Sequence, residues 1–247
     1  MTVMREDDIV TGGSMSVEES ADRARDLLAR YGHLQGISLI EPMVHEEFNG
    51  RITMTSSFGT EAAALLALVA EVDPNLPVIF LDTRKLFGET HRYREQLVDQ
   101  LGLTNIRIMR PDETLLAAED PKGMLFASDT NRCCFLRKVE PLQRALTGYD
   151  AWLTGRKRFH GGERGALPAI EAAGTRIKIN PLAGYQRQDI EDIFENRALP
   201  RHPLEAEGYL SIGCMPCTDR AAPDSNDIRA GRWAGQDKTE CGIHYII

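Results

Sequence analysis

Arg51-Ile-Thr-Met-Thr-Ser56-Ser57-Phe58-Gly59-Thr60 is the stretch of sequence that decides the fold. Residues 51–56 are rich in β-branched and apolar side chains and predict a strand, and the Ala/Leu-rich residues 61–72 predict a helix. A strand, a short Ser/Gly turn and a helix point backbone N–H groups and a helix N-terminus at an anion. Many such turns contain glycine and bind nothing, so this turn alone leaves phosphate binding open.

The same alternation of strand and helix continues along the chain. Further strands are expected at 77–81, 106–109, 150–154 and 176–180, and helices at 17–31, 34–48 (broken or kinked at Pro42), 89–101, 131–146 and 189–196. This order predicts an α/β fold, a mostly parallel sheet flanked by helices with right-handed crossovers. Ligands of such sheets bind beyond the carboxyl ends of the strands, where Ser56–Gly59 and Leu81–Thr83 fall.

Composition narrows the class of protein. The chain has 247 residues, a formal charge of −8 and a pI near 5.3. We expect a disordered N-terminus over 1–16, one α/β nucleotide-binding domain over 17–237 with an irregular C-terminal segment, and a mobile tail over 238–247. The acidic balance argues against nucleic acid as a partner. No apolar run approaches the ~20 residues of a membrane span, and the acidic start is not a secretory signal, so a reducing cytoplasm is expected.

Four of the five cysteines fall into two close pairs, Cys133-Cys134 and Cys214-x-x-Cys217. In a reducing compartment such pairs indicate a metal site or catalysis. Adjacent cysteines on a helix cannot easily present both sulfurs to one tetrahedral zinc ion, whereas a cube of four irons accepts thiolates on different corners. The pairs therefore favour a fully coordinated [4Fe–4S] cluster with a structural or electrostatic role. Zinc is the second interpretation, and two buried pairs without metal are the third.

The fifth cysteine, Cys241, lies in the tail Lys238-Thr239-Glu240-Cys241-Gly242-Ile243-His244-Tyr245-Ile246-Ile247. We expect this tail to be too short to form a packed element, which would leave the thiol exposed. A stray tail thiol is one interpretation. The other is a nucleophile, because an exposed thiol beside cations has a lowered pKa, and an odd cysteine beside a metal quartet is a candidate reactive group.

Cations gather at one predicted strand end. The run Gly155-Arg156-Lys157-Arg158-Phe159-His160-Gly161-Gly162-Glu163-Arg164 follows the strand at 150–154 in an otherwise acidic protein. A solvated face is the simplest interpretation of such a run, but its place beyond a strand end suits the oxygens of a phosphate or sulfate. Lys138 lies four residues after Cys134 and should share its helix face.

Taken together and in this order, these motifs resemble the assimilatory adenylyl-sulfate (APS) reductases, the iron–sulfur branch of the phosphoadenylyl-sulfate reductase family. The resemblance runs from about Ile52 to His244. Its parts are Ser56-Ser57-Phe58-Gly59, Leu81-Asp82-Thr83, Cys133-Cys134 with Lys138, Gly155-Arg156-Lys157-Arg158, Ile212-Gly213-Cys214-x-x-Cys217, Gly231-Arg232-Trp233 and the tail 238–244. It implies the Rossmann-like adenine-nucleotide α-hydrolase fold.

The resemblance implies a two-step reaction in sulfate assimilation. Cys241 attacks the sulfur of APS, expels AMP and becomes an S-sulfocysteine, and thioredoxin as a separate reductant then releases sulfite. His244, Lys138, Arg229 and Arg232 are expected to bind the phosphosulfate, with Lys157 and Arg158 on the other side. Ser56, Gly59 and Leu81 are expected to hold the nucleotide, and Cys133, Cys134, Cys214 and Cys217 the [4Fe–4S] cluster. A homo-oligomer is expected, as is common in the family.

Two departures and three alternatives accompany this interpretation. Lys157-Arg158 stands where the family often has two arginines, so the bidentate fork of one is lost, and Phe58 replaces a small hydroxyl residue. Reduction of the 3′-phosphorylated substrate (PAPS), alone or beside APS, is the near alternative, although PAPS-preferring relatives typically lack the four cysteines. An ATP-using pyrophosphatase and a nucleotide-binding iron–sulfur redox sensor are more remote.

Overall fold

The computed structural model describes residues 14–222, 227–233, 238 and 240–244. It contains one six-stranded sheet in the order β3-β2-β1-β4-β6-β5. The strands are β1 Ile52–Ser56, β2 Val78–Leu81, β3 Ile106–Met109, β4 Ala151–Leu153, β5 Ile170–Ala173 and β6 Arg176–Ile179. All neighbouring pairs are parallel except β5 with β6. The α/β fold expected from the alternation is confirmed.

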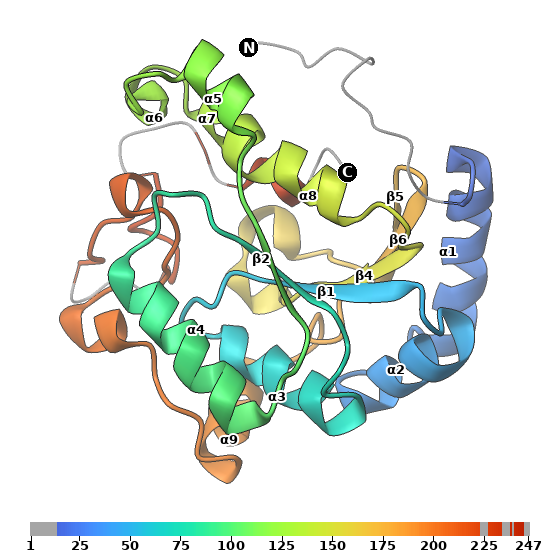
Figure 1. The fold of residues 1–247 in the computed structure, drawn as a ribbon. Coiled ribbons are helices and arrows are strands. Elements are labelled where there is room, and N and C mark those ends of the chain that lie inside the picture. The colour runs from blue at the N-terminus through green and yellow to red at the C-terminus, as the bar shows by residue number, and fades with distance from the viewer. Residues whose placement is uncertain (1–13, 223–226, 234–237, 239, 245–247) are drawn as a thin grey trace.

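Helices cover both faces of this sheet. They are α1 Val17–Tyr31, α2 Ile37–Pro42, α3 Ala62–Val72, α4 Gly88–Leu101, α5 Glu113–Glu119, α6 Leu125–Ser128, α7 Thr130–Cys134, α8 Glu140–Ala145 and α9 Arg187–Asn196. In Figure 1, α8 lies above the sheet, α3, α4 and α9 lie below it, and α1 stands beside β5 and β6. None of the helices in the described part of the chain is long and apolar enough to span a membrane.

The core explains why the central stretch was a reliable signal. Helix α3 is buried over 63–69, so it is apolar all round, as a helix between a sheet and other helices must be. It packs with Met54, Val78, Phe80 and Leu153 from the central strands into the main apolar cluster. Strands buried on both faces read as continuous apolar runs, which is the pattern of β2, Val78–Leu81, and of β4, Ala151–Leu153.

Several elements differ from the expectations, among them α5 and α6, which were not predicted. The helix expected at 131–146 is interrupted by a π-helical segment, Phe135–Val139, between α7 and α8. The predicted second helix, 34–48, begins at Ile37 and changes at Pro42 into a π-helical segment, Met43–Glu47. Strand β5 was not predicted, because it is an edge strand whose burial does not alternate regularly and it pairs antiparallel with β6.

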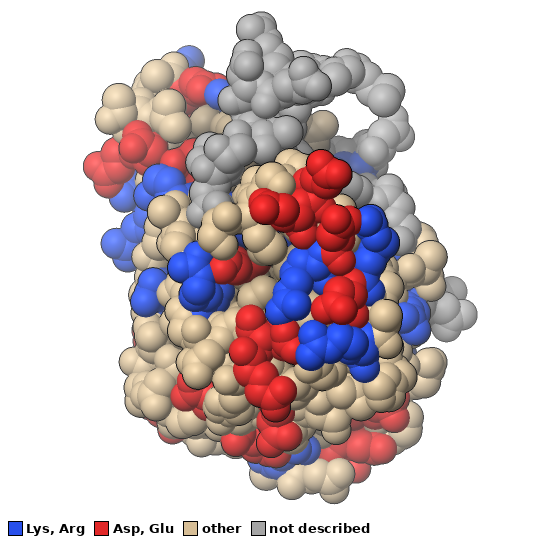
Figure 2. All heavy atoms as spheres, turned by 90° about the vertical axis from the view of Figure 1, so that its right-hand side faces the viewer, with Lys and Arg blue, Asp and Glu red and all other residues tan. Residues whose placement is uncertain are grey.

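The surface beside α1 carries interleaved charges. Figure 2 shows acidic and basic side chains next to one another on the face at the right-hand side of Figure 1. Arg23 and Arg30 of α1 both pair with Glu47, and Arg51 pairs with Asp150. Such pairing is what a solvated, ion-paired surface shows.

The topology places a ligand site at the middle of the sheet. The chain runs from β1 outward through β2 and β3, then returns to place β4 on the other side of β1. The carboxyl ends of β1 and β4 therefore border a topological switch point, where open α/β sheets bind ligands. Residues 14–16 of the expected disordered N-terminus are described: Ser14 donates to Asp150, and Ser16 caps α1. Residues 1–13 lie outside the described part.

Candidate active site

A cavity of about 230 Å³ opens at this switch point. Its walls come from the loops after β1, β2 and β4, from the segment after α7, and from the C-terminal segment. Eight of the predicted site residues line it: Ser56, Gly59, Leu81, Lys138, Lys157, Arg229, Arg232 and Cys241. Residues separated by as much as 185 positions in the sequence therefore meet in one cavity.

The β1–α3 turn brings its backbone rather than a bulky side chain to the cavity. The Ser56 hydroxyl accepts the N–H of Phe58 at 3.2 Å. Phe58 has a φ of 49° and is fully buried, with its ring edge-to-face on Phe80 at 5.4 Å. The phenyl ring at this departure from the family pattern thus packs in the core. A Cβ at Gly59 would come within 3.3 Å of the Ile212 carbonyl, so glycine permits the close approach of that loop.

Some side chains of the cationic run after β4 line the cavity, and others contact the surrounding structure. Lys157 lines the cavity, and its ammonium donates to Glu61 at 2.8 Å and to the Gly155 carbonyl at 3.2 Å. Glu61 also contacts Nε2 of His160 at 2.9 Å. Burial alone would raise the pKa of Glu61, but His160 and Lys157 outweigh it and lower that pKa to about 2. Burial lowers the pKa of Lys157, and the charge and hydrogen bond of Glu61 oppose that lowering.

Two predicted substrate-binding residues are placed elsewhere. The Arg158 guanidinium donates through Nε to the Leu167 carbonyl at 2.7 Å. His244 lies in a 3₁₀ turn, Gly242–His244. Of the described residues, neither Arg158 nor His244 lines the cavity. Arg156, His160 and Arg164 from the same cationic run do line it. Their contribution was missed because the turns after β4 decide which cations face inward, and those turns carry no periodic signal.

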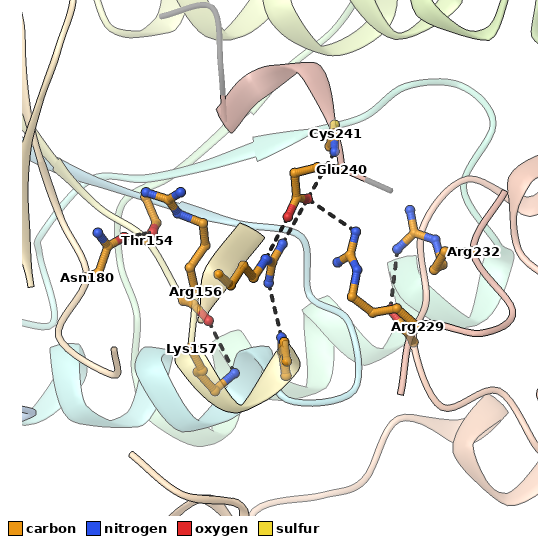
Figure 3. A network of polar contacts seen from close by, with 12 residues as sticks. Thr154, Arg156, Lys157, Asn180, Arg229, Arg232, Glu240 and Cys241 are labelled. Atoms are coloured by element: carbon orange, nitrogen blue, oxygen red, sulfur yellow. Dashed lines mark hydrogen bonds and ion pairs between the residues drawn. The ribbon is translucent and has the colours of Figure 1, made fainter. Parts of the chain in front are cut away.

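Glu240, like Glu61, lines the cavity, and the sequence analysis gave neither carboxylate a role. Figure 3 shows its carboxylate between Arg229 and a second guanidinium, directly beside Cys241. Its oxygens accept Nε and NH2 of Arg164 at 2.6 and 2.9 Å, and NH2 of Arg229 at 3.2 Å. The N–H of Cys241 donates to the same carboxylate at 3.0 Å. The sequence offered one signal, a carboxylate directly before the candidate nucleophile.

Cys241 is buried, and the expectation of an exposed thiol is wrong. Only 7% of the residue is exposed, because 240–244 folds back and packs Cys241 against Cys214, Cys217 and Trp233. The tail residues Thr239 and 245–247 lie outside the described part. A hydrogen bond from the Cys134 thiol lowers the pKa of Cys241 and outweighs its burial, with further lowering by the charge of Lys138. The same bond raises the pKa of Cys134. Of the two thiols, Cys241 is the one that this hydrogen bond favours as the thiolate.

Lys138 stands between the cysteines and the cavity. Burial would lower the pKa of its ammonium, but the negative charges available at Cys214, Cys241 and Cys134 raise that pKa instead. Lys138 therefore remains charged at neutral pH. It lines the cavity from the π-helical segment that follows Cys134, so one cation faces both the thiols and any anion bound in the cavity.

The four remaining cysteines come together from two segments. All four are buried, Cys133 and Cys134 in α7, and Cys214 and Cys217 at the two ends of a 3₁₀ turn. Thr83 contacts the Cys214 sulfur at 3.2 Å, and Leu86 pairs with Cys214 as an isolated β-bridge. Burial raises the pKa of Cys133 and of Cys217, and the nearby Cys214 raises both further. Among the described residues, no three His, Cys, Asp or Glu side chains are arranged to hold a metal ion.

Arg232 and Trp233 close the site on its C-terminal side. The Arg232 guanidinium lies over the Trp233 ring at 4.5 Å and against Gly213, where any Cβ would meet it. The indole packs on the cysteines and is 2% exposed. Stacking fixes the guanidinium plane and leaves its charge directed at the cavity that Arg232 lines.

Comparison with known proteins agrees with this geometry. The family described as "Phosphoadenosine phosphosulfate reductase domain" matches residues 51–220. A protein of Mesorhizobium japonicum, "Adenosine 5'-phosphosulfate reductase", is 52% identical over 224 residues, which are 91% of this chain and 88% of the relative. One from Oceanobacillus iheyensis with the same name is 36% identical over 85% of this chain and 88% of its own.

Solved structures show the same fold. The crystal structure of phosphoadenylyl-sulfate (PAPS) reductase from Candida auris, a phosphate complex, has a TM-score of 0.65 at 27% identity. The similarity covers 83% of this chain and 98% of that one. The extent of the match, together with a cysteine-bearing cavity at the switch point of the sheet, decides the family. This chain belongs to the phosphoadenosine phosphosulfate reductase family.

Proposed function

We propose that the protein reduces adenylyl sulfate to sulfite and AMP, with Cys241 as the nucleophile. The observation that carries this proposal is the position of Cys241. Cys241 lines the cavity together with Lys138, Arg229 and Arg232. A thiolate among cations suits attack on a phosphosulfate, whose charges the cations neutralise as AMP departs. The names of the M. japonicum and O. iheyensis relatives support the substrate.

The first step transfers the sulfonate group to the enzyme. The Cys241 thiolate forms a bond to the sulfur of adenylyl sulfate as the bond from that sulfur to the phosphate oxygen breaks. AMP leaves with this oxygen and both bonding electrons, and the enzyme carries Cys–S–SO₃⁻. Since AMP leaves as a stable anion, no strong general acid is needed. Lys138 and Arg232 are proposed to hold the phosphosulfate, while Ser56, Gly59 and Leu81 hold the nucleotide at the strand ends.

The second step consumes two electrons from a dithiol. One reductant thiolate attacks Sγ of Cys241, so that sulfite leaves and a mixed disulfide forms. The second reductant thiolate resolves this disulfide, frees Cys241 and leaves the reductant oxidised. We propose a thioredoxin-class protein as this partner and the cytoplasm as the compartment, because all five cysteines are free and the reaction needs Cys241 reduced. A homo-oligomer remains part of the proposal.

We further propose that Cys133, Cys134, Cys214 and Cys217 hold a [4Fe–4S] cluster. Four buried thiols from two segments, with Lys138 beside them, match its donor set. Adjacent cysteines on one helix cannot easily present both sulfurs to a single zinc ion, whereas a four-iron cluster accepts thiolates on separate corners. When bound, the cluster would supply fixed negative charge and crosslink the two segments. Lys138 would then be held by that charge while facing the phosphosulfate.

Mass spectrometry of the covalent intermediate tests the proposed function. Anaerobically purified enzyme is incubated briefly with adenylyl sulfate and no thiol, then digested with trypsin, which releases 239–247 with Cys241 as its single cysteine. We expect a gain of one SO₃ on this peptide, and none in Cys241→Ser. Turnover by Cys241→Ser should fall at least ~1000-fold, because an alcohol has no thiolate to offer.

The alternatives predict other results. No adduct with recovered substrate would contradict the proposal and favour a sensor, in which Cys241 is dispensable, or an ATP-using pyrophosphatase. An adduct that forms with PAPS as fast as with adenylyl sulfate would assign dual specificity, and one that forms with PAPS alone would overturn the substrate.

A further inference from the structure

Glu240 occupies a position that the reaction itself does not require. Its two oxygens are shared among Nε and NH2 of Arg164, NH2 of Arg229 and the N–H of Cys241. The arrangement of Arg164 is bidentate, which is the strongest and most directional form of a carboxylate–guanidinium contact. The backbone of the candidate nucleophile is therefore attached to two separate walls of the cavity through one carboxylate (Figure 3).

The burial of this cluster separates it from ordinary surface ion pairs. The side chains of Glu240, Arg164 and Arg229 are 8%, 11% and 17% exposed. Surface pairs contribute little, whereas loss of one partner of a buried pair leaves an uncompensated charge. Holding three such groups together must therefore restrict the conformations open to residue 240 and to Cys241 after it.

Arg164 is itself held in place by the rest of the site. Its NH1 donates to Nδ1 of His160 at 3.0 Å, so Nε2 of that imidazole carries the proton donated to Glu61 at 2.9 Å. Glu61 precedes α3 and also binds Lys157. A continuous series of contacts thus runs from the β1–α3 turn through His160 and Arg164 to Glu240. The residues at the ends of β1 and β4 therefore hold Glu240, and through it the backbone of Cys241.

We propose that Glu240 is the positioning residue of this enzyme, the latch that holds Cys241 at the cavity for attack on the substrate. The inference rests on the proposed role of Cys241 as nucleophile. Attack needs the thiolate close to the substrate sulfur and in line with the leaving oxygen, and a tail held at one carboxylate provides that placement before substrate binds. Arg164 and Arg229 have their charge compensated by Glu240 in this tail-docked state.

Amide hydrogen exchange tests the latch without substrate. We expect the amides of 240–244 to exchange about tenfold faster in Glu240→Gln holoenzyme than in wild type, because the neutral amide loses the charge-assisted bonds to both arginines. Glu240→Asp keeps the charge but is shorter, and an intermediate rate is expected. Glu207→Gln is the matched control, since Glu207 is 53% exposed and pairs with Arg220 at 3.3 Å; its 240–244 amides should exchange as in wild type.

Single-turnover kinetics give the second readout. For Glu240→Gln we expect sulfonate transfer from adenylyl sulfate to slow about tenfold while the substrate concentration at half-saturation stays within about twofold, since alignment and not substrate binding is lost. If Glu240 only kept Arg164 and Arg229 from binding the substrate, Glu240→Gln would bind adenylyl sulfate more tightly than wild type. That result, or exchange at the wild-type rate in Glu240→Gln, would overturn the proposal. If the proposed function were wrong, no transfer would occur in wild type, yet the exchange result would still report on the latch.

Discussion

His202 is a buried imidazole whose hydrogen bonds require the neutral form. Its Nδ1 accepts the N–H of Leu204 at 3.2 Å, and its Nε2 lies 3.2 Å from the Thr90 hydroxyl. Only 1% of the residue is exposed, and burial lowers its pKa from 6.5 to about 4. Protonation would place a charge in the interior and remove the acceptor for Leu204. The folded state therefore binds fewer protons than the unfolded state between these two values.

This difference fixes the sign of a pH effect on stability. Stability rises with pH wherever the unfolded state binds more protons. The contribution of neutral His202 to the free energy of unfolding is therefore complete above pH 6.5 and is lost as pH falls toward about 4. From pH 7 to 5 we expect His202 to account for a loss of about 2 kcal/mol in the free energy of unfolding. Urea unfolding at both pH values measures it. His202→Gln should reduce the pH dependence by this amount, whereas His33→Gln, at an exposed position, should not. Equal pH dependence in all three proteins would contradict the prediction.

At the scale of elements, α1 is held by a capping box. The Ser16 hydroxyl accepts the N–H of Glu19 at 3.1 Å, and the Glu19 carboxylate accepts the N–H of Ser16 at 2.7 Å. We expect Ser16→Ala to lower the free energy of unfolding by about 1 kcal/mol without changing turnover, because α1 packs on β5 and β6 and does not line the cavity. Urea denaturation measures the loss. Glu18→Ala, also in the first turn, should lower the free energy of unfolding by only a few tenths of a kcal/mol, because it loses only an interaction with the helix dipole. An equal loss of stability in both variants would rule out the cap.

Elements were predictable where burial is periodic and local. The pattern at 17–31 gave α1 with its observed bounds, and 106–109 gave β3. Helix α5 was missed because none of its residues is buried, so no apolar period marks it, although Asp112 caps its first N–H groups. Strand β5 carried a different signal, since Gly174 with φ 60° begins the two-residue turn that joins it to β6.

At the scale of the whole molecule, many residues that line the cavity were predictable from the sequence, and their ion-pair partners were not. Spacing and resemblance singled out Cys241, Lys138 and Arg232 before the fold was known. Glu61 and Glu240 were missed, because they meet their cations across 96 and 76 positions of sequence. Only the arrangement of β4, β1 and the C-terminal segment brings such groups together. The burial of Cys241 likewise depends on contacts that its own ten residues do not encode.

The C-terminal segment contributes no strand to the described sheet. It is therefore held to the rest of the protein by a small number of contacts. After α9 the chain runs past α4 (Figure 1), and its C-terminal part lines the cavity. It is attached through the bridge of Leu86 with Cys214, the apolar cluster around Trp233, and the contacts of Glu240. A cluster held by both cysteine pairs would join α7 to this segment and close a loop of roughly 80 residues.

We therefore expect cluster removal to weaken the whole molecule as well as the reaction. Anaerobic chelation, or Cys134→Ser, should lower Tm by on the order of 10 °C, since closing a loop of this length contributes a few kcal/mol. Turnover should be lost together with the absorbance of the cluster, because the position of Lys138 depends on the thiolates beside it. Cys241→Ser is the matched control: it should keep both the absorbance and the Tm while losing turnover. A cluster-free protein with wild-type Tm, or with full turnover, would show that the cysteine quartet neither joins the two segments nor positions Lys138.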